Sequence, residues 1–448
     1  MNRRGYVNGC ESEIQPALVE ACVEHAYEAV KTTRKTSLHD RASTLEKIAG
    51  ALRGATTPLA RQLAEDSGFL TEHDMRLEVQ RAAEVFRLTA AYTLAGWSTA
   101  LDLDSVERAR GAFGIVRREP IGAVLGICAF NGPLLIPAHK LAPAIAAGTS
   151  IILKPAPGAA RASVDLGKMA VNAGWPAAAV AVLDVDNDTT MKLVRDPRLP
   201  VISFTGGRVG WTIKEAAPRK HVQLELGGVG AVLVAADANL EQAARECAAG
   251  AFVRSGQSCI SVQRIYAARS IFPELVSLLV DAVRELQATH PIGPLVHEEA
   301  CSWIERLVQD AVDGGAQLVH GGSRAGAYFE PTVLTETTSQ MKVMQEEAFG
   351  PVVAVNPYDL IEEAISEINS VGGAIHHGIY TADLDVAFGA ADAIQAGGVI
   401  INGPCTWRAD HMPYGGVGQA GFGREGIAHS VLHFTEPKVI VVRPSRSR

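Results

Sequence analysis

The chain has 448 residues, of which 47% are hydrophobic and 20% are charged. This balance is typical of a globular protein and excludes a disordered chain, and the length predicts two or three subdomains rather than one core. The formal net charge of −8 argues against general nucleic-acid binding. No apolar run has the length of a membrane span, and no apolar stretch follows the N-terminal arginines, so we expect neither a membrane segment nor a secretion signal.

The seven cysteines are odd in number and scattered, and no CxxC pair occurs among them. We therefore expect no disulfide framework and no zinc or other metal site. A reducing cytoplasm is the expected compartment.

Residues 1–100 are predicted to be helical, because apolar side chains such as Leu45, Ile48 and Leu52 recur at the spacing of one helix face. Residues 101–120 change to a short extended pattern. We expect these helices to cover one face of a sheet that forms later in the chain.

From residue 121 onward, short apolar segments alternate with helical ones. Strands are expected at residues 121–128, 150–154, 179–183, 201–204 and 222–226, with helices at 134–147, 160–173 and 209–217 between them. This alternation implies a doubly wound parallel sheet, an α/β fold with its ligand at the carboxyl edge of the strands. The second half repeats the pattern, with helices expected at residues 240–253, 273–286 and 298–313 and strands at 398–402 and 435–442.

Three residue types that together can attack a carbonyl group occur in distinctive local contexts. Cys259 ends the run Gly-Gln-Ser-Cys, Glu225 lies in Leu-Glu-Leu-Gly-Gly, and Asn131 precedes Gly-Pro directly after an expected strand. A thiolate is a nucleophile, an amide N–H stabilises an oxyanion, and a carboxylate can activate water. Each also has a plainer interpretation: a single cysteine is most often a buried small hydrophobe, Asn before Gly-Pro usually forms a turn, and a glutamate is often a surface residue.

Two segments at the expected sheet edge suit a dinucleotide. Gly207, in Phe-Thr-Gly-Gly-Arg, lies between a strand and a helix, where backbone N–H groups can face a pyrophosphate. Lys154 ends another strand, where a cation suits the adenosine side. Taken alone, these glycines are not a GxGxxG fingerprint and more often form a tight turn, and a lysine at a strand end is more often solvated.

Together these segments resemble the aldehyde dehydrogenase superfamily, with matches from about residue 118 to the C-terminus. Of the seven cysteines, Cys259 alone has the family's Gly-Gln-x-Cys context, and its spacing from Glu225 agrees with the family. The resemblance implies an α/β, aldehyde dehydrogenase-like fold and a homodimer or homotetramer. Its expected parts are a doubly wound Rossmann-type cofactor domain (residues 1–100 and 121–227), an α/β catalytic domain (228–421) and a small β oligomerisation subdomain (101–120 and 422–448).

The resemblance also implies a reaction, the oxidation of an aldehyde to a carboxylic acid with NAD or NADP through a thiohemiacetal and a thioester on Cys259. Asn131 matches the amide that holds the oxyanion, and Glu225 matches the carboxylate that activates the deacylating water. Family members that pass the acyl group to coenzyme A commonly lack this glutamate. Its presence therefore favours the non-acylating type, which releases a free acid.

Further matches concern the cofactor. The resemblance places five residues there: Phe130, Lys154, Gly207, Glu347 and Phe349. In the family, the glutamate that Glu347 matches binds the nicotinamide ribose and the phenylalanine that Phe349 matches backs the ring, whereas local grounds alone favour a solvated turn. Pro157 stands where many NAD-preferring members have a glutamate, so the choice between NAD and NADP stays open.

The substrate is the least determined part. Arg408 and Tyr414 are expected at the mouth of the substrate tunnel, where Arg408 either binds an anionic tail or pairs with Asp410 at the rim. We expect a small polar or carboxylate-bearing aldehyde. Lys140 and Glu425 match family positions that are sometimes assigned to proton relay.

Two other function classes stay open. A cofactor-independent cysteine hydrolase needs a base near Cys259, and no sequence motif offers one. A non-catalytic structural or binding paralogue of the same fold need not keep all of Cys259, Glu225, Asn131, Lys154 and Glu347, which are intact here.

Overall fold

The computed structural model describes residues 4–444, and its larger sheet has eight strands in the order β19-β9-β8-β5-β6-β7-β1-β2. Five central strands run parallel: β5 Val124–Ile127, β6 Ile151–Lys154, β7 Val180–Leu183, β8 Val201–Thr205 and β9 His221–Glu225. They lie within or almost within the predicted ranges, because parallel strands are covered on both faces and therefore read as short apolar runs. From β5 the chain continues to β6 and β7 on one side, and then returns to form β8 and β9 on the other side. The carboxyl ends of β5 and β8 therefore flank a topological switch point.

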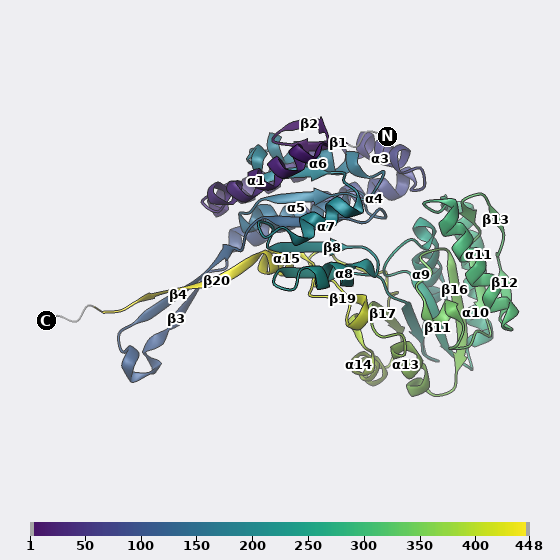
Figure 1. The fold of residues 1–448 in the computed structure, drawn as a ribbon. Coiled ribbons are helices and arrows are strands. Elements are labelled where there is room, and N and C mark those ends of the chain that lie inside the picture. Colours follow the sequence, from purple (N-terminus) through teal and green to yellow (C-terminus); the bar gives the residue numbers. More distant parts are fainter. Residues whose placement is uncertain (1–3, 445–448) are drawn as a thin grey trace.

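Helices cover both faces of this first sheet (Figure 1). One face packs on α2 Leu38–Gly54, α3 Thr56–Ser67, α4 Glu72–Ala95, α5 Leu135–Ala147, α6 Ala160–Asn172 and α15 Ile427–Phe434. The other face packs on α1 Pro16–Thr33, α7 Asn187–Arg195 and α8 Val209–Ala216. The predicted doubly wound fold is confirmed.

The helical prediction for residues 1–100 is wrong at its start. β1 Arg4–Val7 and β2 Cys10–Glu13 form a hairpin that extends the first sheet beside β7. Asn8 and Gly9 form its turn with φ of 50° and 82°. Asn-Gly is the preferred dipeptide of such tight hairpins, a local signal that helix periodicity does not register.

A second sheet has seven strands, all parallel except the edge strand β12. In spatial order they are β12 Gln317–His320, β15 Thr332–Thr335, β16 Val352–Tyr358, β11 Val262–Ala268, β10 Gly230–Val234, β17 Ala374–Tyr380 and β18 Ala396–Ile401. One face packs on α9 Leu240–Phe252 and α10 Phe272–Thr289. The other packs on α11 Glu298–Asp313, α13 Ile361–Asn369 and α14 Leu384–Ala393. Smaller elements are the hairpin of β13 Arg324–Ala325 and β14 Tyr328–Phe329, and α12 Lys342–Gln345.

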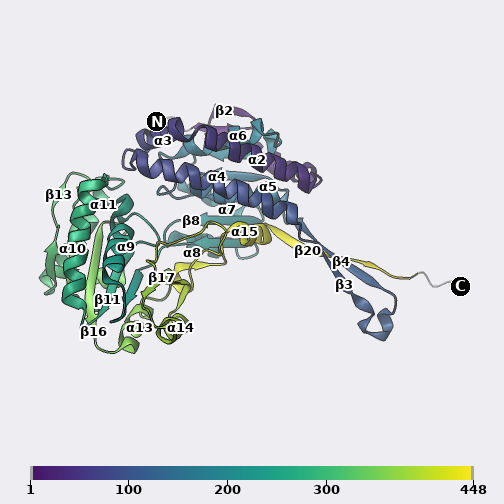
Figure 2. The same cartoon turned by 180° about the vertical axis from the view of Figure 1, so that it is seen from behind.

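Three antiparallel strands form an arm that reaches away from both layered bodies (Figures 1 and 2). They are β3 Thr99–Asp102, β4 Phe113–Pro120 and β20 Thr435–Val442, in the order β20-β4-β3. Residues 421–434 lie outside this arm, although the sequence prediction assigned 422–448 to it. β19 Gly421–Phe422 pairs with β9 through its backbone, and α15 packs on the first body because Val431 and Phe434 enter its core.

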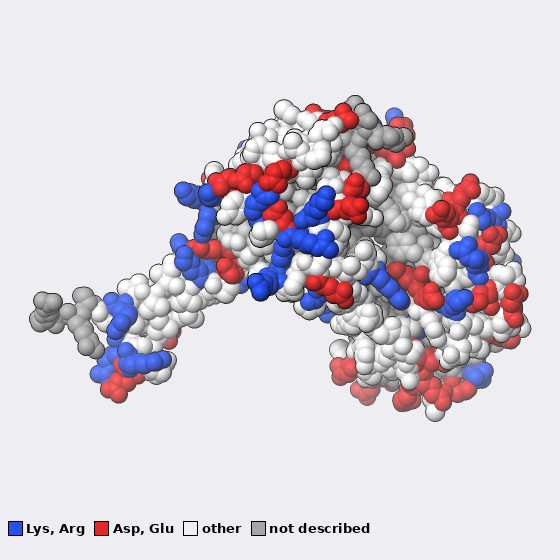
Figure 3. Space-filling view, in the orientation of Figure 1, with Lys and Arg blue, Asp and Glu red and all other residues white. Residues whose placement is uncertain are grey.

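The ends of the predicted ranges, residues 1–3 and 445–448, lie outside the described part of the chain. Within residues 4–444, no helix combines the length and apolarity needed to cross a membrane. On the face drawn in Figure 3, acidic and basic side chains are interspersed over the bodies and the arm.

Candidate active site

A cavity of about 670 Å³ runs from the carboxyl edge of the first sheet to the loop that carries Cys259. Eleven of the twelve predicted site residues line it: Phe130, Asn131, Lys154, Gly207, Glu225, Cys259, Glu347, Phe349, Arg408, Tyr414 and Glu425. Lys140 is the exception. Its side chain is fully buried behind the wall, where Nζ donates to Ser203 Oγ and Thr205 Oγ1 at 2.9 Å each.

A left-handed turn places Cys259 in the cavity. After α9 ends, Arg254, Ser255 and Gly256 all have positive φ, between 56° and 67°. Glycine is required at the third position, since a Cβ on Gly256 would overlap the carbonyl oxygen of Gly350. Non-glycine residues in this region are strained and persist only where the surroundings fix them.

The Cys259 sulfur faces the cavity yet lies well inside the protein. Sγ is 3.0 Å from the hydroxyl oxygen of Tyr414. Burial raises the pKa of the thiol well above its usual value, and the nearby Glu225 carboxyl raises it further. Stabilisation of the thiolate therefore has to come from hydrogen bonds or from a bound ligand.

Asn131 follows β5 and points its amide at the cysteine loop, where Nδ2 donates to the carbonyl oxygen of Gln257 at 3.1 Å. The Asn131 backbone is held from the same loop, because Arg254 Nη1 donates to its carbonyl oxygen at 3.0 Å. Hydrogen bonds thus join Asn131 to the loop that carries Cys259, although the two segments are far apart in the chain.

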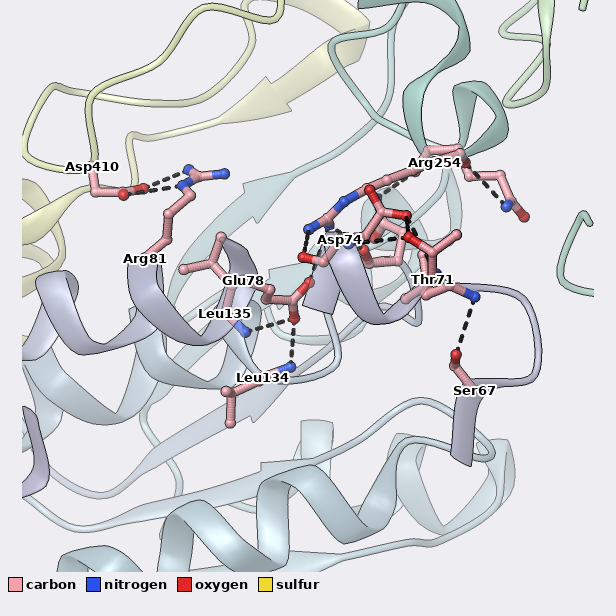
Figure 4. Close-up of polar contacts among 12 residues, drawn as sticks. Ser67, Thr71, Asp74, Glu78, Arg81, Leu134, Leu135, Arg254 and Asp410 are labelled. Carbon is pink, nitrogen blue, oxygen red and sulfur yellow. Dashed lines mark hydrogen bonds and ion pairs between the residues drawn. The ribbon is translucent and has the colours of Figure 1, made fainter. Parts of the chain in front are cut away.

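A buried glutamate ties this unit to the helices (Figure 4). Glu78, on α4, is fully buried, and its Oε1 accepts the backbone N–H groups of Leu134 and Leu135 at 2.8 and 3.0 Å. These groups begin α5 and have no partner within that helix. Glu78 Oε2 lies 3.1 Å from Arg254 Nη1, in an ion pair without hydrogen-bond geometry. Arg254 Nη2 also donates to the carbonyl oxygen of Asp74 at 3.3 Å.

Glu225 ends β9 with its side chain buried beside the cavity. Its Oε1 has no hydrogen-bond partner among the described residues. Burial is the main cause that raises the pKa of this carboxyl to about 7, and the negative charge of Glu425 adds to it. A carboxyl group with a pKa near neutrality suits general base catalysis.

Glu347 closes the cavity over Gly227, where a Cβ would overlap its carboxylate. Its Oε1 is buried and lacks a hydrogen-bond partner within residues 4–444. Burial, followed by the charge of Glu225, raises the pKa of Glu347 to about 8. Beside it, Phe349 contacts the Phe130 ring edge to face, with 5.8 Å between ring centroids.

Residues 8–440 match the aldehyde dehydrogenase family. The chain belongs to this family. The predicted fold and enzyme class are thereby confirmed, and the alternatives of a non-catalytic paralogue and a cofactor-independent hydrolase are set aside.

Relatives of this aldehyde dehydrogenase cover nearly its whole length. It is 35% identical over 432 residues to 3-sulfolactaldehyde dehydrogenase of Priestia aryabhattai, covering 95% of this chain and 90% of the relative. The structure of aldehyde dehydrogenase 21 from Physcomitrella patens, in complex with the reaction product succinate, superposes with a TM-score of 0.93 at 32% identity, over 98% of this chain and 95% of that one. NADP-dependent glyceraldehyde-3-phosphate dehydrogenase from Bacillus halodurans, complexed with NADP, gives a TM-score of 0.92 at 29% identity, over 99% and 95%. The predicted nicotinamide cofactor is confirmed as a class.

The aldehyde dehydrogenase cavity fits such a cofactor at the sheet edge. Lys154 ends β6 there, and Gly207 precedes α8 with open space where a Cβ would stand. The unpartnered Glu347 Oε1 suits a ribose hydroxyl. No group of three or more His, Cys, Asp or Glu side chains in the described residues could hold a metal ion.

Two residues that sequence analysis missed, Arg81 and His139, contact Asp410 or Arg408. Arg81, on α4, binds Asp410 through Nε and Nη2 at 3.1 and 2.6 Å, whereas Arg408 Nε lies 3.8 Å from the same carboxylate. Arg408 Nη2 instead contacts His139 Nε2 at 3.2 Å, and its guanidinium stacks 3.6 Å from the centre of the Tyr414 ring. Asp410 also lies 3.4 Å from His139 Nε2, so the predicted rim pair with Arg408 is the longest of the three charged contacts of Asp410.

The two predicted relay residues do meet. Lys140 Nζ lies 3.6 Å from Glu425 Oε2, and His139 Nδ1 lies 3.8 Å from Glu425 Oε1. Burial opposes ionisation of Glu425, but Lys140 and His139 outweigh it, so the pKa of this carboxyl is lowered. His139, next to Lys140 on α5, has its own pKa lowered mainly by burial.

Sequence reasoning missed Glu78, Arg81, His139 and Arg254. Glu78 and Arg81 lie on a helix with no motif, and their partners are distant in the chain. Two weak signals were available: Arg254 precedes the Gly-Gln-Ser-Cys run, and His139 precedes a predicted relay lysine.

Proposed function

We propose that this enzyme oxidises a small polar aldehyde bearing a carboxylate to the free acid, without coenzyme A. The observation that carries this proposal is the position of Arg408. Its guanidinium lines the cavity and stacks on the Tyr414 ring, whose hydroxyl contacts the Cys259 sulfur. The Nε of Arg408 is buried without a hydrogen-bond partner in the described residues. A buried guanidinium with unused donors favours an anionic ligand.

In this mechanism, the Cys259 thiolate attacks the aldehyde carbon to form a thiohemiacetal. The Asn131 amide and the Cys259 backbone N–H stabilise the oxyanion. A nicotinamide cofactor, when bound, would supply the hydride acceptor that the change from thiohemiacetal to thioester requires. Glu225 then takes a proton from a water molecule, which attacks the thioester carbon, and the carbon–sulfur bond breaks to release the acid.

Five residues hold the cofactor in this proposal: Phe130, Lys154, Gly207, Glu347 and Phe349. The unpartnered, buried Oε1 of Glu347 supports a role toward the nicotinamide ribose. Pro157 lines the cavity beside Lys154 and supplies no carboxylate against a 2′-phosphate, which leaves both NAD and NADP as candidates.

A proton leaves Glu225 through buried groups. Glu425 is close enough to raise the pKa of Glu225, and Lys140 joins Glu425 to the hydroxyls of Ser203 and Thr205. We assign Lys140 and Glu425 to this relay because a base that starts each cycle deprotonated has to discard its proton.

Two relatives support the anionic substrate. The Priestia relative is a 3-sulfolactaldehyde dehydrogenase, and the Physcomitrella structure holds succinate as its reaction product. Both compounds are small and carry an anionic group, a sulfonate in 3-sulfolactaldehyde and carboxylates in succinate. Tyr414 and Arg408 are the residues that would contact such a tail in the present cavity.

The decisive experiment is an aldehyde panel followed by reduced-nicotinamide absorbance, with NAD and NADP tested separately and coenzyme A omitted. The panel pairs carboxylate, sulfonate and neutral aldehydes of equal size. We expect turnover with the carboxylates and none in Cys259→Ala. Arg408→Glu, with Arg408→Gln as the milder variant, should raise KM for anionic aldehydes selectively, and an equal rise for neutral ones would reject the anion-binding role.

The arm supports the predicted homodimer or homotetramer, because it projects from the body and carries exposed apolar side chains at Phe113, Val439, Val441 and Val442. Sedimentation equilibrium gives the state directly. The seven cysteines are free, which agrees with the proposed cytoplasmic compartment.

A further inference from the structure

Tyr414 is held rigidly against the nucleophile. Its side chain is buried, and its backbone exchanges two hydrogen bonds with Glu425, from Tyr414 N to Glu425 O at 2.8 Å and from Glu425 N to Tyr414 O at 2.6 Å. The His376 ring packs edge on against its ring, with 5.3 Å between centroids. These contacts fix the phenol so that its hydroxyl oxygen lies 3.0 Å from Cys259 Sγ.

The surroundings of Cys259 leave its thiolate short of stabilising groups. Glu225 and Glu347 both raise the pKa of the thiol through their negative charge. Among the described residues, the Tyr414 hydroxyl is the partner that can donate to Sγ, whereas the Glu225 carboxylate accepts a hydrogen bond from the thiol and so favours its neutral form. Burial raises the pKa of the Tyr414 phenol well above its usual value, so the hydroxyl keeps its proton and is a donor across the working pH range.

Arg408 strengthens this donor. Its guanidinium stacks on the Tyr414 ring, 3.6 Å from the centroid. A cation over an aromatic face withdraws electron density from it and makes the phenol O–H a better donor. Positive charge therefore acts on the sulfur through Tyr414, although no Lys or Arg of the described residues forms an ion pair or hydrogen bond with it.

We propose that Tyr414 is a catalytic residue whose O–H donates a hydrogen bond to the Cys259 sulfur whenever that sulfur carries negative charge. The charge appears twice in the cycle. It is present on the thiolate before the carbon–sulfur bond forms, and it returns when that bond breaks and the electron pair goes back to sulfur during release of the acid. This inference rests on the proposed role of Cys259 as nucleophile.

A tyrosine that only shapes the substrate tunnel would behave differently. A tunnel wall acts on KM and on the choice of aldehyde, whereas a donor to sulfur acts on thiolate formation and on kcat for every aldehyde alike. Tyr414→Phe separates the two roles, because it removes one oxygen and keeps the ring on which Arg408 stacks.

The test measures alkylation of Cys259 by iodoacetamide against pH, with the modified peptide quantified by mass spectrometry so that the other six cysteines do not contribute. In Tyr414→Phe we expect the alkylation midpoint about one pH unit higher, and kcat about 10- to 100-fold lower for charged and neutral aldehydes alike. Tyr380→Phe is the matched control, since it removes a buried hydroxyl that donates to Glu246 in the second body, and it should leave the midpoint in place. Replacing Tyr414 with 3-fluorotyrosine, a more acidic phenol, should move the midpoint below that of the wild type.

An unchanged midpoint in Tyr414→Phe overturns the inference, as does a loss confined to KM for anionic aldehydes. Failure of the underlying function has another signature. If Cys259→Ala keeps its turnover, the nucleophile itself is wrong; if Cys259→Ala is inactive and Tyr414→Phe matches the wild type, only the role of Tyr414 falls. A melting curve for each variant separates both results from unfolding.

Discussion

The two ends of the cavity are built in different ways. At the sheet edge, Lys154 is the last residue of β6 and Gly207 lies two residues after β8, so the strands set their positions. At the other end, Cys259 and Asn131 lie on irregular loops that side chains from distant segments hold together. The first end offers open space beside Gly207, where we propose that the cofactor binds, whereas at the second end hydrogen bonds fix the positions of a few side-chain atoms.

The two ends therefore differ in how the positions of their side chains are maintained. A strand end tolerates small changes because the whole sheet supports it, while a loop depends on each of its few bonds. We therefore expect substitutions at the cysteine end to have large effects on rate, and substitutions at the sheet edge to have small ones.

The largest expected effect belongs to Cys259→Ala. Removing the sulfur removes the covalent intermediate, so turnover should fall by on the order of 10⁴-fold or more. Steady-state kinetics with an excess of NAD or NADP measure it. Cys10→Ser, which changes an exposed cysteine on the β1–β2 hairpin, is the control and should keep full activity. Residual turnover above one percent in Cys259→Ala would contradict the contrast between the two ends.

Asn131→Ala is the next step down. Loss of one oxyanion donor typically lowers kcat by about 10²- to 10³-fold. The amide also bonds Gln257 O, so part of the loss comes from a looser cysteine loop. Pre-steady-state measurement of the hydride-transfer burst distinguishes the two, because a pure oxyanion defect slows the burst without changing its amplitude. A variant that loses only substrate affinity would show that the amide is not at the reacting carbonyl.

Glu78→Gln tests whether the buried ion pair holds the cysteine end together. It leaves the Arg254 guanidinium without its counter-charge, and breaking such a pair typically destabilises a protein by about 3 kcal/mol. Chemical denaturation measures this, and kcat should fall with it. Asp281→Asn breaks an exposed pair with Arg284 instead, and should change stability by less than about 1 kcal/mol. Equal losses of stability in the two variants would show that the Glu78–Arg254 pair contributes no more than a surface ion pair.

Glu225→Gln should trade activity for stability in a pH-dependent way. The carboxyl has a pKa of about 7 in the fold, above its ordinary value of 4.5, so folding favours its protonated form. Wild-type stability therefore falls as the pH rises from 4.5 to 7, and stays lower above pH 7. The amide cannot ionise, so the variant should be more stable than the wild type by about 3 kcal/mol at pH 8 and equal to it near pH 4. Thermal melts of both proteins from pH 4 to pH 8 measure this difference in stability. A difference that stays constant over this range would contradict a raised pKa of Glu225.

The contrast between the ends also explains what could be predicted from the sequence. Strands β5 to β9 and most long helices were predicted within a few residues, since periodicity and burial determine them. Short motifs carry Cys259, Glu225 and Asn131, and this is why the sequence could single out three residues that line one cavity; their roles stay predictions. Glu78 and Arg81 were not, because their role comes from partners far away in the chain, Arg254 and Asp410, which no local pattern relates. The β1–β2 hairpin was missed because it adds strands at the edge of a sheet whose centre lies elsewhere in the chain.

The smallest effect on stability and cofactor binding is expected for a substitution at the sheet edge. A Cβ at Gly207 meets nothing within 4 Å, and its φ lies outside the left-handed region. Gly207→Ser should therefore change stability by less than about 0.5 kcal/mol and cofactor KM by less than about 3-fold. Gly206→Ala, one position earlier, would bring its Cβ to 2.7 Å from the Phe204 ring and should weaken cofactor binding by displacing that ring. Calorimetric titration with NAD and NADP compares the two. A large loss in Gly207→Ser would mean that the sheet edge is as exacting as the cysteine end.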